Sequence, residues 1–69
     1  MKNINIVITD RNNTTEEIVL SCLPDNAVEM SGENIIIGEN KDLIIPINEV
    51  SRIEIWSDDW DERYNVFEF

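Results

Sequence analysis

A chain of 69 residues is long enough for one small domain, and a domain of this size buries only about 60% of the surface that its unfolded chain exposes. Fifteen acidic and five basic residues give a formal net charge of −10, which argues against direct binding to nucleic acid or to an anionic membrane, because both are bound through clustered lysine and arginine. The single cysteine, Cys22, has no intramolecular disulfide partner, and the first residues lack the apolar stretch of a signal peptide. We therefore expect one domain, residues 1–69, in the cytoplasm.

The N-terminal third of the chain contains one clear strand and one ambiguous segment. Ile4, Ile6 and Ile8 alternate with polar residues, which is the two-residue period of a strand with one buried face. After a polar turn, residues 15–23 favour a second strand, because a short apolar run contains a β-branched pair. The same segment also fits a helix capping box that begins at Thr14, so a short helix at 15–23 stays open.

The middle of the chain alternates turn residues with isoleucine-rich runs. Residues 27–30 are a short strand candidate. Residues 35–37 and 42–45 flank the four-residue loop 38–41, and this pattern predicts a β-hairpin. Pro46 has no amide proton, so we expect it to end the second strand of that hairpin.

The C-terminal third predicts two further strands, residues 52–56 and 64–69. Five to seven short strands joined by tight turns indicate a mainly β fold. The expected architecture is a single small antiparallel sheet or a barrel of SH3-like or Sm-like size. A short helix at 15–23 is the one helical element that the sequence leaves as an alternative.

The parity of the strands predicts both a core and a second apolar face. The expected core residues are Ile4, Ile6, Ile8, Ile18, Leu20, Ile35, Ile37, Leu43, Ile45, Ile53 and Ile55. The opposite faces also carry apolar side chains, which would form a self-association face or be covered by another element: Val7, Val19, Ile36 and Ile44.

The segment 56–64 places three large aromatic residues among four carboxylates. Tryptophan and tyrosine often anchor protein interfaces because they bury a large area at a small entropic cost, and nearby carboxylates can steer and pair with Lys or Arg. The residues predicted to bind a basic protein surface are Trp56, Asp58, Asp59, Trp60, Asp61, Glu62 and Tyr64. The alternative is that both tryptophans fold over a thin core while the carboxylates face water.

Catalytic and metal-binding patterns are not found in the sequence. The chain has no histidine, and Cys22 lies within an apolar run, so we expect a small core residue there and no enzyme activity. The carboxylates of residues 58–62 lack the spacing and the central glycine of a calcium loop. We expect no cofactor and no metal ligand. A module that binds a divalent cation is kept as a further alternative function.

These features favour a non-enzymatic protein-binding module, such as an inhibitor or immunity-type protein, that presents an acidic face with aromatic anchors to a basic protein. The most specific version of this hypothesis is that the face is a nucleic-acid mimic, whose carboxylates occupy the phosphate positions on a nucleic-acid-binding protein. The size and charge are similar to those of small phage-borne inhibitors, although no motif assigns the chain to a family. The alternative is a structural subunit that forms a homo-oligomer, as a ring or a small phage component.

Overall fold

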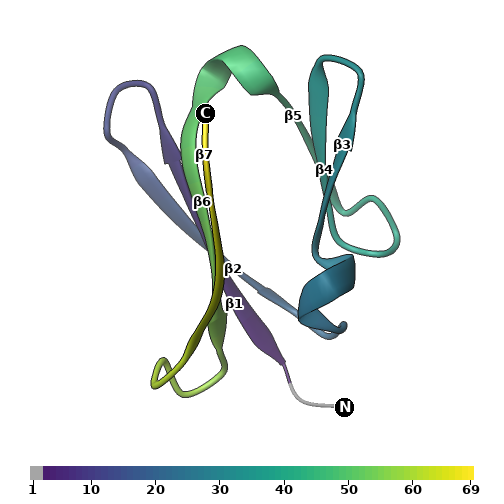
Figure 1. Cartoon of the computed structure of the whole chain (residues 1–69), viewed down its shortest axis with the longest axis vertical. Helices are drawn as coiled ribbons and strands as arrows, with labels where there is room; N and C mark the ends of the chain where they lie inside the picture. Colours follow the sequence, from purple (N-terminus) through teal and green to yellow (C-terminus); the bar gives the residue numbers. More distant parts are fainter. Residues whose placement is uncertain (1–2) are drawn as a thin grey trace.

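The computed structural model describes residues 3–69, and this part of the chain forms seven β-strands and two short 3-10 helices (Figure 1). The elements are β1 (Ile4–Asp10), β2 (Thr15–Leu20), η1 (Pro24–Asn26), β3 (Val28–Ser31), β4 (Asn34–Ile37), β5 (Leu43–Pro46), η2 (Ile47–Glu49), β6 (Val50–Ser57) and β7 (Arg63–Glu68). The predicted mainly β fold is confirmed. Neither helix in residues 3–69 is long and apolar enough to cross a membrane.

The strands form two antiparallel sheets that face each other across the core (Figure 1). The larger sheet has the order β2-β1-β6-β7, and the smaller has the order β3-β4-β5. The chain crosses between the sheets through η1 and returns through η2. Within the described residues the sheets do not close into a barrel, so the architecture is a small two-sheet sandwich.

The segment that could have been strand or helix is the strand β2. Its register with β1 pairs Ile18 with Ile6 and Leu20 with Ile4, which turns these side chains toward the core. Asp10 closes the preceding turn, because its Oδ1 accepts the amide protons of Asn12 at 2.8 Å and Thr14 at 3.0 Å. The residues of the expected capping box therefore complete a hairpin turn and the first positions of β2 instead of starting a helix.

Glycine shapes the two hairpins of the smaller sheet. Gly32 joins β3 to β4 with a φ of 61°, and Gly38 follows β4 with a φ of 92°, both in the left-handed region that favours glycine. A Cβ atom at Gly38 would also collide with the carboxylate of Asp42. The predicted hairpin of 35–45 is confirmed, and β5 ends at Pro46 as expected.

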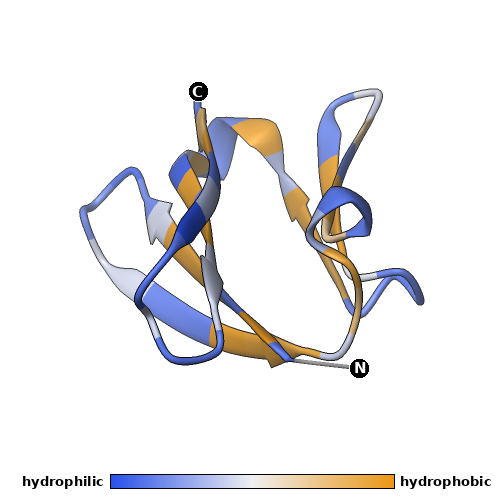
Figure 2. Cartoon of the chain, turned by 60° about the horizontal axis from the view of Figure 1, so that its bottom comes forward, coloured by the Kyte–Doolittle hydropathy of each residue, from blue (hydrophilic) through white to orange (hydrophobic). Residues whose placement is uncertain are grey.

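The core lies between the two sheets, and Figure 2 shows apolar stretches in strands of both. Eight of the expected core residues and Cys22 are buried, whereas Ile18, Leu43 and Ile45 are half-buried and pack against the core. The core predicted from strand alternation did not include Ala27 and Val50, which are 0% and 1% exposed. Each follows a 3-10 helix at a crossing between the sheets, where the alternation of a strand gives no information.

Candidate functional site: the acidic hairpin

The segment 56–64 contains the end of β6, the turn 58–62 and the start of β7, and we call it the acidic hairpin. It lies at one end of the larger sheet, at the bottom of Figure 1. The amide of Ser57 donates to the carbonyl of Glu62 at 2.8 Å, and the amide of Trp60 donates to the carbonyl of Ser57 at 3.1 Å. These bonds close a turn whose four carboxylates are exposed.

The buried hydroxyl of Ser57 organises this turn. Its Oγ lies 2.8 Å from an oxygen of Asp59 and 2.8 Å from an oxygen of Asp61, so its single proton is donated to one carboxylate at a time. The same oxygen accepts the amide proton of Glu62 at 3.1 Å. The Asp58 and Glu62 side chains make no hydrogen bond to any described residue, so these two carboxylates face outward freely.

The neighbouring strand β1 stabilises the hairpin through one buried side chain. Asn5 of β1 is 6% exposed, and its side-chain amide donates to the carbonyls of Ser57 at 2.8 Å and Asp58 at 3.2 Å. Sequence reasoning missed both Asn5 and Ser57, because it treated them as ordinary polar residues. The available signal was the spacing of Ser57, Asp59 and Asp61, which is typical of side chains that bond to a local turn.

The turn favours the ionised form of one carboxyl group, that of Asp59. Hydrogen bonding with the Asp61 side chain, and next with the Ser57 hydroxyl, lowers the pKa of Asp59. None of the carboxylates of residues 58–62 forms an ion pair with a described cation. Within residues 3–69, no group of three or more His, Cys, Asp or Glu side chains is arranged to hold a metal ion.

The three aromatic residues of the hairpin have different surroundings. The rings of Trp56 and Trp60 lie 6.1 Å apart at an angle of 47°, and the guanidinium of Arg63 lies 5.8 Å from the Trp56 ring. Trp60 and Tyr64 are 42% and 43% exposed. The core cluster of the described residues includes neither tryptophan, so both are placed beside the carboxylates and outside the sandwich interior.

Trp60 has a backbone conformation that is rare for a bulky residue. Its φ is 64°, in the left-handed region, where such a residue carries a strain of about 1–3 kcal/mol. The surrounding turn bonds hold it there and present its ring at the surface.

The residues of the expected self-association face lie on two separate surfaces. Val7 and Val19 are on the outer face of the larger sheet, where Val7 is flanked in register by Glu17 and Glu54. Ile36 and Ile44 are cross-strand partners on the outer face of the smaller sheet. The sandwich places these two outer faces on opposite sides of the molecule, so the four residues do not form one patch.

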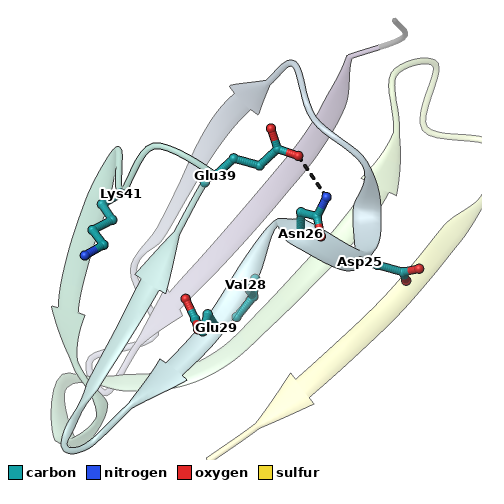
Figure 3. A pocket seen from close by; sticks show the side chains of 7 residues that line it. Asp25, Asn26, Val28, Glu29, Glu39 and Lys41 are labelled. Atoms are coloured by element: carbon teal, nitrogen blue, oxygen red, sulfur yellow. Dashed lines mark hydrogen bonds between the residues drawn. The ribbon is translucent and has the colours of Figure 1, made fainter.

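A polar pocket of about 510 Å³ lies away from the hairpin, beside η1 and the loop after β4. Figure 3 shows the side-chain amide of Asn26 turned toward Glu39, to which it donates at 2.8 Å. Asp25, Glu29 and Lys41 also line this pocket, which gives it mixed charge. Its lining has no Ser, Thr, Cys or His side chain, and it is separate from the acidic hairpin.

Comparison of the chain with models of known families, with curated proteins and with solved structures finds no match.

Proposed function

We propose that this chain is a non-enzymatic protein-binding module whose acidic hairpin docks on a basic surface of another protein, as an inhibitor or immunity-type protein does. The observation that supports this is a closed turn that holds four carboxylates, none of them in an ion pair with a residue of the described range 3–69, beside the exposed rings of Trp60 and Tyr64. A cytoplasmic location fits the buried, unpaired Cys22.

Preorganisation makes the turn suitable for binding. The bonds from Asn5 and around the Ser57 hydroxyl fix the loop before a partner arrives, so less conformational entropy is lost on association. The aromatic rings supply apolar contact area, and the carboxylates attract and orient a cationic surface.

The most specific partner that we propose is a nucleic-acid-binding protein. Its binding surface is rich in Lys and Arg that normally contact phosphates, and the carboxylates of residues 58–62 would take the place of those phosphates. The net charge of −10 extends the attraction beyond the hairpin itself.

Self-assembly is the second candidate, and one observation favours it. Ile44 is 54% exposed and lies beside Ile36 on the outer face of the smaller sheet, so a second copy could cover this pair. The molar mass of the chain in solution tests this candidate. An assembly that Ile44→Lys dissociates would support it, and a monomeric wild-type protein would contradict it.

The binding proposal is tested with the full chain immobilised as bait. Basic proteins captured from a cell extract are identified, and the affinity of the purified partner is then measured for variants. Asp58→Lys with Glu62→Lys reverses the two carboxylates that do not bond to Ser57. Trp60→Gly removes the aromatic ring and suits the φ of 64°. We expect each variant to weaken binding at least tenfold.

The matched control is Glu29→Lys with Glu33→Lys, which changes the net charge equally on exposed residues of the β3–β4 hairpin. Its affinity should stay within about threefold of the wild type at moderate salt, because the lost attraction is long-range and screened. Equal losses in the control and the hairpin variants would show that general acidity, and not the hairpin, binds the partner.

A further inference from the structure

A groove with an apolar floor opens along one side of the sandwich, where β2 and β5 are the outer strands of their sheets. Its volume is about 450 Å³. Ile8, Leu43 and Ile45 provide apolar lining, and the lining also includes the acidic residues Asp10, Glu16 and Glu49. This groove is separate from the acidic hairpin, none of whose residues lines it.

The register explains why this side of the sandwich is open. Ile8 pairs with Glu16 on one side and with Ile53 on the other, and Ile53 pairs with Phe67. Side chains in such a row share one face of the sheet, here the core face. Phe67 packs against the core at the β7 edge, whereas the β2 edge has the carboxylate of Glu16 at the equivalent position.

The groove carries negative charge that the described residues do not neutralise. The lining includes three carboxylates, those of Asp10, Glu16 and Glu49, and one cation, Arg11, whose guanidinium donates to main-chain oxygens of Asn48 at 3.4 Å and Phe69 at 3.2 Å. Neither Glu16 nor Glu49 forms an ion pair within the described residues. An apolar floor beneath two free carboxylates complements a long side chain that is apolar along its stem and positive at its end.

We propose that this groove receives a lysine side chain from an extended segment of a partner protein. The methylene stem lies against Leu43 and Ile45, and the ammonium group reaches Glu16 and Glu49. This inference concerns a second surface and does not depend on binding by the acidic hairpin.

The test uses a synthetic peptide, acetyl-Lys-Val-Lys-Val-Lys-amide, added to the isotope-labelled full chain while backbone amide shifts are followed by NMR. We expect the shifts to cluster at residues that line the groove. A peptide in which 2,4-diaminobutyric acid replaces lysine, compared at about pH 6, keeps the charges but loses two methylene groups of each stem, and it should bind at least fivefold more weakly.

Two adjacent residues of β2 provide a matched pair of variants. Glu16→Gln removes the carboxylate on the groove side and should weaken peptide binding at least fivefold. Glu17→Gln makes the same change in charge on the opposite face of the strand, opposite Val7, and should leave binding within about twofold.

Three results would overturn the inference. Equal weakening by Glu16→Gln and Glu17→Gln, or equal binding of the two peptides, would show that charge alone attracts the peptide. Shifts that cluster in residues 56–64 would assign the peptide to the hairpin. Concentration-dependent shifts of the groove residues without peptide would assign the groove to a second copy of this chain.

Discussion

The turn of the acidic hairpin concentrates like charges, and a few individual groups make this possible. Four carboxylates fall within residues 58–62. The Ser57 hydroxyl lies between Asp59 and Asp61, and the backbone amide of Asp61 approaches Asp59 Oδ1 at 3.4 Å. Hydrogen bonds to a carboxylate favour its charged form, so the turn geometry and the ionisation of Asp59 support each other.

This coupling predicts a specific pH dependence. The pKa of Asp59 is lower in the folded chain than the value of about 3.9 for an unfolded aspartate, so its ionisation stabilises the fold above about pH 4. That contribution is lost as the pH falls through the lowered folded-state pKa. Urea denaturation at several pH values between about 5 and 2 should therefore show a shallower loss of stability for Asp59→Asn than for the wild type.

Asp58→Asn is the control for this measurement, because the Asp58 carboxylate makes no side-chain hydrogen bond to a described residue. Its pH profile should follow that of the wild type. A wild-type slope in Asp59→Asn would mean that the turn does not depend on the ionisation of Asp59.

At the scale of elements, the hairpin depends on a side chain of the adjacent strand. Asn5 of β1 bonds two carbonyls of the turn and is itself buried. Asn5→Ala should lower the free energy of unfolding by about 1–2 kcal/mol, since it removes both hydrogen bonds of a buried side-chain amide. Asn3→Ala, at an exposed position before the strand, should change it by less than about 0.5 kcal/mol.

The measurement is chemical denaturation followed by tryptophan fluorescence, which also reports on Trp56 and Trp60 beside the turn. An Asn5→Ala protein as stable as the wild type would show that β6 and β7 hold the turn without help from β1.

The elements themselves were largely predictable from the sequence, for a physical reason. Alternation with a period of two places Ile4, Ile6 and Ile8 on one face, and turn residues mark where each strand stops. Strand parity says which face a residue occupies, but it does not say to which sheet the strand belongs. Val7 and Ile44 were therefore grouped by sequence on one face, although they lie on different sheets.

The residues of the site were predictable from the sequence, but the contacts that arrange them in space were not. Trp60, Tyr64 and the carboxylates of residues 58–62 are visible in the sequence, and the structure places them around one turn. The role of Asn5 arises from the pairing of β1 with β6, which is distant in the sequence, and the groove beside Glu16 is completed by β5 of the other sheet, so local patterns do not reveal them.

At the scale of the whole molecule, the imbalance of fifteen acidic to five basic residues opposes the compact state. Two of the five cations, Arg52 and Arg63, share Glu54 at 3.7 and 3.4 Å, which leaves most carboxylates without a partner. Salt screens this repulsion, so we expect the melting temperature to rise by several degrees between about 10 mM and 500 mM sodium chloride.

The double variant Glu29→Lys with Glu33→Lys raises the net charge from −10 to −6, because each replacement adds two units. Its melting temperature, measured by differential scanning calorimetry, should rise less with salt than that of the wild type. An equal rise in both proteins would attribute the effect to the general action of salt on apolar burial.

The position of Glu16 also bears on how this chain stays separate from other copies of itself. Each sheet has two outer strands with unpaired backbone groups, and in small β proteins such edges are starting points for fibre growth. A chain that added to β2 and extended the core layer would bury the Glu16 carboxylate against its own apolar side chains. One charged residue at that edge thus limits amyloid-like stacking in a protein whose core is otherwise rich in isoleucine.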